Sequence, residues 1–324
     1  MLRIVYMGTP YFAIPALEAL IAKSAPGALL PQGLEIVTVI TRPDKPAGRG
    51  REVVFSPVKQ SALAHNIPVE QPGSFKKAEN SDALATYSAD LYIVAAFGQI
   101  LPQKVLDQPQ HGTLNIHASL LPRYRGADPI AETIVQGERE TGVSIMLLDA
   151  GIDTGPVLLS KSMSLTGEET TGSLTEQLAE LGAQALLETL PLWIAGKIAP
   201  QPQDNDRATH THLLKKEDGE IVWSLPAAAL ARKVRAYQPW PTAFTHWRGK
   251  VLKFLAAHPL GVELDTTIQP GTVSVQEEAG HTVIAVATGS GLLLVTQLQL
   301  EGKKALSSEE FLRGYNHIVG EILE

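Results

Sequence analysis

Two polar side chains interrupt one apolar run of the chain at alternate positions. Residues 112–117 read Gly-Thr-Leu-Asn-Ile-His, a buried-strand pattern that places Asn115 and His117 on one face, because side chains of a strand alternate. An amide can donate a hydrogen bond to a developing oxyanion, and an imidazole can take up and return a proton near neutral pH. For either residue alone, a hydrogen-bonded core side chain is the preferred interpretation.

Two polar segments follow that run. Residues 119–126, Ser-Leu-Leu-Pro-Arg-Tyr-Arg-Gly, form either a loop that shapes a ligand pocket or a plain connection with two solvated arginines. Residues 148–155, Leu-Asp-Ala-Gly-Ile-Asp-Thr-Gly, supply two carboxylates, Asp149 and Asp153, and two glycines that permit a tight path. A simple tight turn is the alternative for this second segment.

The first two hundred residues alternate short apolar runs with amphipathic stretches, as βαβ units do. This pattern predicts an α/β fold with a doubly wound, mostly parallel, Rossmann-like sheet. In such sheets ligands bind beyond the carboxyl ends of the strands, where Asn115 and His117 are expected. The predicted strands lie near residues 2–7, 35–41, 67–70, 91–97, 112–117, 142–148 and 156–160.

A helix is predicted over residues 173–194, with Ser173 and Glu176 spaced as a capping box and Pro191 ending or kinking it. The residues after it, from Pro200 to Asp206, are polar and without periodicity, as linkers are. We therefore predict a first domain over residues 1–199, a linker over 200–210 and a second domain over 211–324.

The second domain has shorter alternating runs separated by Gly and Pro turns, a pattern typical of a small antiparallel, OB-like β-barrel. Ser307 and Glu310 have capping-box spacing and predict a short helix near the end of the chain. The predicted barrel strands lie near residues 250–255, 271–275, 282–287 and 292–298.

Composition narrows the class of protein. The chain of 324 residues is long enough for two domains, and it contains no cysteine, which excludes disulfides and thiolate catalysis. It begins almost at once with a strand-like run, and no apolar stretch is long enough to span a membrane, so we expect a cytoplasmic protein. The net charge is −7, with 12 basic and 12 acidic residues from residue 207 on, so a polyanion would have to bind at local basic clusters.

Taken together, the three polar segments resemble the signature of the formyltransferases that use 10-formyltetrahydrofolate. The matching residues are Asn115-Ile116-His117, Ser119-Leu120-Leu121-Pro122 with Arg125-Gly126, and Asp149-x-Gly151-x-Asp153-Thr154-Gly155. The resemblance implies 10-formyltetrahydrofolate as formyl donor and no metal. It also implies a folate pocket formed in part by Ser119, Leu120, Leu121 and Pro122.

The same resemblance implies three catalytic residues. Asn115 would stabilise the oxyanion of the tetrahedral intermediate, and His117 would take the proton of the attacking amine or protonate the departing folate nitrogen. Asp153 would stabilise the imidazolium or relay a proton through water, and the sequence leaves both roles open.

A basic stretch bears on the acceptor. Residues 41–51, Thr-Arg-Pro-Asp-Lys-Pro-Ala-Gly-Arg-Gly-Arg, carry a net charge of +3, and their prolines and glycines are expected to keep them out of regular structure. An arbitrary loop of this kind is usually solvated surface. Here it resembles the loop that contacts the tRNA acceptor end in family members acting on initiator methionyl-tRNA. Arg49 is the main predicted tRNA contact, with Arg42 and Arg51 as further candidates.

The second domain supports the same partner, because residues 223–225 and 235–243 resemble the start of the tRNA-binding barrel of those enzymes. Such an enzyme is expected to be a monomer. The alternatives are a formyltransferase acting on a sugar amine or glycinamide ribonucleotide, and a non-catalytic RNA-binding protein on the same scaffold. The single glycine of residues 7–10 does not indicate a nucleotide cofactor. His210 and His212 are interpreted as exposed rather than metal-binding.

Overall fold

The computed structural model describes residues 1–47, 52–265 and 267–324. The chain divides into two compact units. The first comprises Met1–Pro129, Glu140–Ser164 and Thr175–Thr211, and the second comprises Ile130–Arg139, Leu165–Leu174 and His212–Glu324. In the part of the chain that is described, no helix has both the length and the apolar character needed to cross a membrane.

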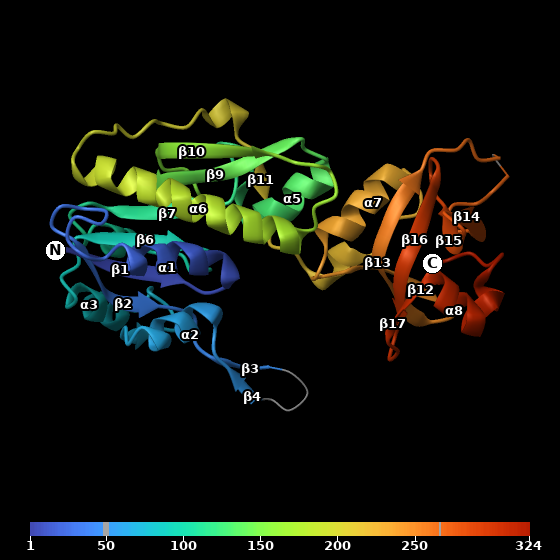
Figure 1. Ribbon diagram of the computed structural model, residues 1–324, viewed down its shortest axis with the longest axis horizontal. Coiled ribbons are helices and arrows are strands. Elements are labelled where there is room, and N and C mark those ends of the chain that lie inside the picture. Colours follow the sequence, from blue (N-terminus) through green and yellow to red (C-terminus); the bar gives the residue numbers. More distant parts are fainter. Residues whose placement is uncertain (48–51, 266) are drawn as a thin grey trace. The chain divides into compact units, whose positions relative to one another are not determined.

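The first unit is built on a seven-stranded sheet with the order β10-β9-β7-β6-β1-β2-β5 (Figure 1). Five strands, β7, β6, β1, β2 and β5, are parallel. Strand β9 runs antiparallel to β7, and β10 runs antiparallel to β9. The predicted doubly wound, mostly parallel sheet is confirmed. The strands are β1 Leu2–Gly8, β2 Leu34–Ile40, β5 Val69–Glu70, β6 Leu91–Ala95, β7 Thr113–His117, β9 Glu140–Leu147 and β10 Val157–Ser164.

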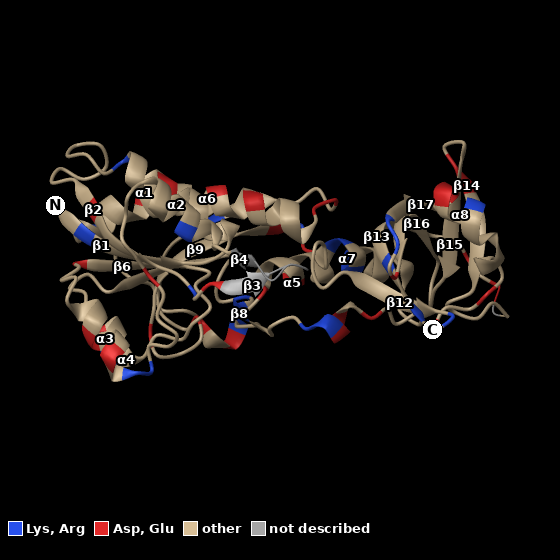
Figure 2. Ribbon diagram, turned by 90° about the horizontal axis from the view of Figure 1, so that it is seen from below, with Lys and Arg blue, Asp and Glu red and all other residues tan. Residues whose placement is uncertain are grey.

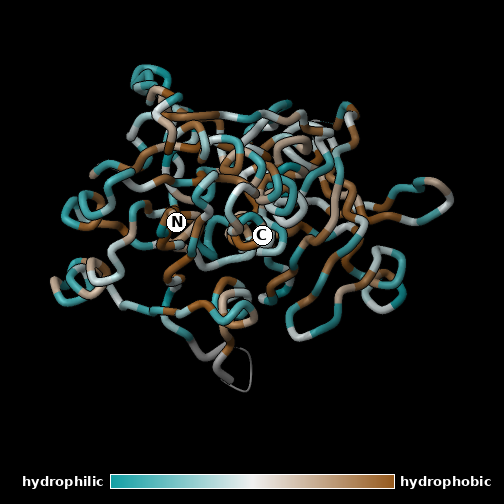
Figure 3. Tube along the Cα trace, turned by 60° about the vertical axis from the view of Figure 1, so that its left-hand side comes forward, coloured by the Kyte–Doolittle hydropathy of each residue, from teal (hydrophilic) through white to brown (hydrophobic). Residues whose placement is uncertain are grey.

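Helices cover both faces of this sheet, which is why β6 and β7 are buried at every residue. Figure 2 shows α1, α2 and α6 on one face and α3 and α4 on the other. Hydrophilic residues gather in the outer turns of the chain trace, whereas hydrophobic residues are more frequent in its interior (Figure 3). The bounds are η1 Tyr11–Ala13, α1 Ile14–Ala22, α2 Pro57–Ala64, α3 Ala78–Ala85, α4 Gln103–Leu106 and α6 Thr171–Ile194, of which the residues up to Leu174 count with the second unit. Helix α5, Pro129–Gln136, belongs to the second unit from Ile130 on.

The long helix α6 begins two residues before the predicted start, so Ser173 is not its N-cap. The Thr170 hydroxyl accepts from the Ser173 N–H at 3.2 Å, and the Ser173 hydroxyl accepts from the Thr170 N–H at 3.0 Å. A reciprocal cap therefore exists, but Ser173 is its third helical residue. Pro191 lies in the last turn, and the helix ends at Ile194.

The basic stretch contains regular structure, contrary to expectation. Strand β3, Lys45–Ala47, pairs antiparallel with β4, Glu52–Val54. Pro46 does not prevent this pairing, because an edge strand tolerates proline.

The second unit contains an antiparallel sheet of order β12-β13-β16-β15-β14, with β17 beside β16. Its core surrounds Trp223 and Phe254, whose ring centroids lie 5.8 Å apart. The Ser307–Glu310 capping box at the start of α8 is confirmed. The strands are β12 Ala243–Trp247, β13 Lys250–Leu260, β14 Val273–Glu278, β15 His281–Ala287, β16 Leu292–Leu300 and β17 Ala305–Ser307; the helices are η3 Lys216–Gly219, α7 Ala227–Ala236, α8 Ser308–Tyr315 and η4 Asn316–Ile318.

The last residues of the chain bond to both edge strands of that sheet. Val273 of β14 donates to Glu321 O at 2.8 Å, and Glu324 and His246 of β12 exchange backbone hydrogen bonds at 3.1 and 3.2 Å. The C-terminal segment thus pairs with the two free edges, as closure of a barrel requires.

Candidate active site

Strand β7 carries the two polar residues from which the site is built. Asn115 pairs with Val94 of β6 and Met146 of β9, and His117 pairs with Ser144 of β9. Both side chains are buried, with 8% of Asn115 and 6% of His117 exposed. Alternation along the strand puts them on one face at the carboxyl end of β7, where the sequence predicted a site.

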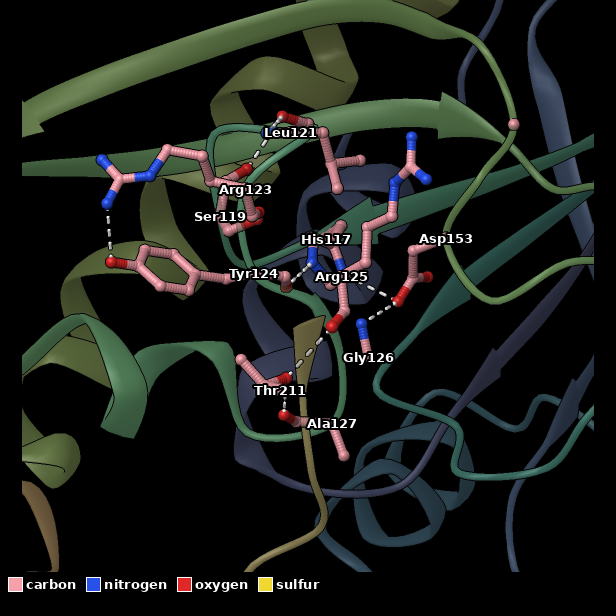
Figure 4. A network of polar contacts seen from close by, with 12 residues as sticks. His117, Ser119, Leu121, Arg123, Tyr124, Arg125, Gly126, Ala127, Asp153 and Thr211 are labelled. Carbon is pink, nitrogen blue, oxygen red and sulfur yellow. Dashed lines mark hydrogen bonds and ion pairs between the residues drawn. The ribbon is translucent and has the colours of Figure 1, made fainter. Parts of the chain in front are cut away.

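The His117 imidazole is held between a carbonyl and a carboxylate (Figure 4). Its Nε2 lies 2.9 Å from Tyr124 O, and its Nδ1 lies 3.6 Å from Asp153 Oδ2. Because a carbonyl only accepts, Nε2 carries a hydrogen, which leaves Nδ1 as the nitrogen that can take up a proton. The structure thus brings together His117 and Asp153, as predicted.

Asp153 reaches His117 through a loop that turns back on itself. Strand β9 ends beside Leu114, at the far end of β7, so residues 148–156 must run back along β7 before entering β10. The path is tight, because a Cβ at Gly155 would lie 1.9 Å from Leu147 O. Asp153 has a φ of +52°, and its Oδ2 accepts from the Gly126 N–H at 2.8 Å.

The Asn115 amide makes no side-chain hydrogen bond within the described part of the protein, although the residue is buried. In that same part, the fully enclosed side-chain atoms without a partner are Gln99 Oε1 and Thr113 Oγ1, so the Asn115 amide still reaches solvent. A buried amide with unused hydrogens is costly unless a ligand or water binds it. The burial of Asn115 at the end of β7 and its unused amide hydrogens therefore fit a group that binds a ligand oxygen.

The loop after β7 has a fixed shape. The Ser119 hydroxyl donates to Arg123 O at 2.6 Å, while the Ser144 hydroxyl donates to Ser119 O at 2.8 Å and accepts from the Leu121 N–H at 3.1 Å. Ser119 is completely buried, whereas Leu120, Leu121 and Pro122 are half-buried. The surface available to a ligand here is consequently the apolar side of the loop rather than the serine hydroxyl.

Of the three predicted tRNA contacts, Arg42 is described, whereas Arg49 and Arg51 lie outside the described residues. Arg42 is exposed, and its guanidinium packs over Gly98 beyond the end of β6. Arg42 follows the carboxyl end of β2, which is parallel to β1, as β1 is to β6, so it stands at the same edge of the sheet as the carboxyl ends of those strands.

A cluster of hydrogen bonds fixes the first residues of the basic stretch, near Arg42 and Asp44. The Lys59 ammonium bonds to Asp44 and also donates to Gln71 Oε1 at 2.8 Å. Gln71 Nε2 donates to Asp44 Oδ1 at 2.9 Å and to Arg42 O at 2.8 Å. The hydrogen bonds from Lys59 and Gln71 lower the pKa of the Asp44 carboxyl, which stays ionised at neutral pH.

Some functional groups could not be identified from side-chain types. Tyr124 O and the Gly126 N–H, which hold His117 and Asp153, are backbone groups and leave no sequence signal. His210 and His212 are exposed, as predicted. Within the described residues, no three histidine or acidic side chains come together as a metal site would require.

Comparisons with known proteins match both parts of the chain. Residues 3–190 match the formyl transferase family and residues 213–316 match the C-terminal domain of formyl transferases. A methionyl-tRNA formyltransferase from Hahella chejuensis is 42% identical over all of this chain and 98% of its own. One from Dehalococcoides mccartyi is 46% identical over 98% of this chain and 97% of its own.

Among solved structures, an N-formyltransferase from Helicobacter canadensis, in complex with folinic acid and dTDP-3-aminofucose, superposes with a TM-score of 0.62 at 15% identity. The match covers 91% of this chain and 98% of the other. The fold and these matches thus define an enzyme of the α/β class. The chain belongs to the formyl transferase family, which confirms the resemblance found in residues 115–155.

Proposed function

We propose that this protein transfers the formyl group of 10-formyltetrahydrofolate to the α-amino group of initiator methionyl-tRNA. The observation that carries the proposal is the arrangement of the buried Asn115 and His117 of β7 with the half-buried Asp153, in a chain similar along its whole length to proteins named methionyl-tRNA formyltransferase. Acting on tRNA, the protein would work in the cytoplasm, as a monomer.

In the proposed reaction, the amine nitrogen attacks the formyl carbon, and the carbonyl π electrons move to the oxygen. The tetrahedral intermediate collapses as the bond between that carbon and folate N10 breaks, giving the N-formyl amine and tetrahydrofolate. Asn115 donates an amide hydrogen to the oxyanion. Its amide hydrogens are available for this, because they have no partner in the described part of the protein. Such a fixed donor stabilises charge that develops only during the reaction.

His117 moves the proton. Its Nε2 is engaged with Tyr124 O, so Nδ1 accepts the proton that the amine loses and returns it to N10 as that nitrogen leaves. Asp153, 3.6 Å from Nδ1, stabilises the imidazolium that exists between the two transfers. This distance is too long for a direct hydrogen bond, so the contact acts through charge or through one intervening water.

The remaining predicted sites complete the proposal. The apolar side of the loop of Ser119, Leu120, Leu121 and Pro122 packs against folate, and Arg49, with Arg42 and Arg51, contacts the tRNA acceptor end. Catalysis is assigned to a domain over residues 1–199, and further tRNA contact to a domain over 211–324, with residues 200–210 between them.

A panel of acceptors tests the acceptor class. The purified protein is given 10-formyltetrahydrofolate and either methionyl-tRNA, glycinamide ribonucleotide or a nucleotide-linked amino sugar, and tetrahydrofolate release is measured. We expect release with methionyl-tRNA alone. Faster release with either small amine would establish the alternative acceptor, and no release with any acceptor would refute formyl transfer.

A further inference from the structure

The segment between the two matched regions is attached to the site at several points. After Gln201, which pairs with Val157 of β10 in an antiparallel bridge, the chain passes through η2, Asn205–Arg207, and β11, His210–Thr211. Strand β11 pairs in parallel with β8, Arg125–Gly126. We call residues 203–211 the strap.

One arm of the strap holds the Asp153 loop. Gln203 Nε2 donates to Asp153 O at 2.8 Å and to Gly155 O at 2.7 Å. Both hydrogens of a single amide are therefore used to fix the backbone on the two sides of Thr154. Because Gln203 is half-buried, water would not fully replace these hydrogen bonds if they were lost.

The other arm holds the backbone that contacts His117 and Asp153. Thr209 Oγ1 accepts from the Tyr124 N–H at 2.8 Å, and Thr209 O accepts from the Arg125 N–H at 2.9 Å. Gly126, with a φ of +105°, lets β11 come close, since a Cβ there would lie 2.6 Å from Thr211 O. Figure 4 shows the Thr211 hydroxyl between the carbonyls of Arg125 and Ala127, which share its single hydrogen as acceptors.

A buried cation joins the two arms. Arg125 is only 3% exposed, and its guanidinium bonds to two strap amides, with Nε 2.9 Å from Gln203 Oε1 and Nη2 2.9 Å from Asn205 Oδ1. A buried guanidinium must keep such acceptors, because leaving its hydrogens unpaired is costly. Arg125 thus fixes the Gln203 carboxamide in the orientation whose amino group points to Asp153 and Gly155.

We propose that Gln203 is a positioning residue for catalysis, and that the strap sets the distance between Asp153 and His117. This inference rests on the proposed function. The Asp153 carboxylate accepts from the Gly126 N–H, and the Asp153 carbonyl accepts from Gln203. Both hydrogen bonds depend on the strap, because Gly126 pairs with β11 and Gln203 belongs to the strap itself. Displacing a charge by about 1 Å in an active site can lower turnover by ~10²-fold.

The test compares Gln203→Ala with a matched control, Gln201→Ala. The Gln201 side chain is exposed, and within the described residues it bonds only to Ala199 O, at 3.1 Å. Its bridge to Val157 uses backbone atoms that alanine retains. In formylation of methionyl-tRNA, Gln203→Ala should lower kcat roughly 10- to 100-fold with KM for both substrates changed less than about three-fold, and Gln201→Ala should lower it less than about two-fold. Equal kcat values for the two variants would overturn the proposal.

A double-mutant cycle separates positioning from general destabilisation. If Gln203 acts through Asp153, adding Gln203→Ala to Asp153→Asn should lower kcat by less than about two-fold, because the charge being positioned is already gone. Additive losses in kcat would contradict the proposal.

A measurement without substrate keeps the strap testable apart from the proposed function. Hydrogen exchange of the Gly126 amide, which bonds to Asp153 Oδ2, should quicken about ten-fold or more in Gln203→Ala and stay unchanged in Gln201→Ala. An unchanged rate in Gln203→Ala would refute the strap, whatever the enzyme formylates. Absence of formylation by the unmodified protein would instead refute the proposed function alone.

Discussion

Replacing Asp153 by Asn removes the negative charge beside His117 and keeps nearly the same shape. The amide oxygen of Asn can still accept from the Gly126 N–H, so the loop should keep its position. At the observed 3.6 Å, and with an effective dielectric constant of about 20, a full charge pair is worth about 4 to 5 kcal/mol. Solvent screening is weak here, because the side chains of His117 and Asp153 are only 6% and 15% exposed.

Part of that interaction survives in the variant as the amide dipole. We therefore expect Asp153→Asn to lower kcat by roughly 10² to 10³, with KM for folate and methionyl-tRNA changed less than about three-fold. The assay is steady-state formylation at saturating tRNA, with the charged and formylated esters separated and counted.

The matched control is Asp149→Asn in the same loop. The exposed Asp149 carboxylate accepts from the Gly151 N–H at 3.0 Å and from the Thr154 hydroxyl at 2.7 Å, whereas among the described residues the carboxylate paired with His117 is that of Asp153. This variant should keep more than about a third of the activity. If Asp153→Asn loses no more activity than Asp149→Asn, charge stabilisation of the imidazolium is refuted.

Three further predictions concern other residues. Asn115→Ala should lower kcat by roughly 10² to 10³ through loss of the oxyanion donor, and near-normal turnover would remove that role. Arg49→Ala should raise KM for methionyl-tRNA and leave folate affinity intact, whereas an equal loss of both would contradict the tRNA assignment. The Ser307 N–H and hydroxyl hydrogen bonds lower the pKa of Glu310, so its stabilisation of α8 is present above about pH 4.3, the usual value for Glu, and is lost as pH falls further. Urea unfolding should therefore show a smaller loss of stability between pH 6 and pH 3 in Glu310→Gln, and an identical loss would refute the capping role.

Much of the first unit was predictable, because each strand leaves a pattern in its own short stretch of sequence. Strands such as β6 are apolar at every position since helices cover both faces, and that continuous pattern identified the central strands of the sheet. The edge strand β10 instead alternates between buried and more exposed residues. The pattern does not encode direction, so the antiparallel course of β9 was not predicted. That course matters, because it makes the Asp153 loop double back to reach His117.

The strap was beyond sequence reasoning for a different reason. Gln203, Asn205 and Thr209 form a polar stretch without periodicity, which indicates only a connection. Gln203 and Thr209 bond to backbone carbonyls and N–H groups of distant residues, which every sequence supplies equally. Gln203 and Asn205 also accept from the Arg125 guanidinium, about 80 residues earlier in the chain, and the sequence pattern does not indicate this pairing. In the second unit, likewise, nothing in the pattern of the final residues indicated that Glu324 would pair with His246 at the edge of the sheet.

The central claim is tested most directly by formylation of a defined acceptor. The protein is mixed with 10-formyltetrahydrofolate and initiator methionyl-tRNA, with elongator methionyl-tRNA and the His117→Ala variant as controls, and the formylmethionyl ester is measured. We predict rapid formation of this ester on initiator tRNA, far less on elongator tRNA, and a rate lower by roughly 10² to 10⁴ in the variant. No formylmethionyl ester on initiator tRNA, or an undiminished rate in the variant, would contradict the account.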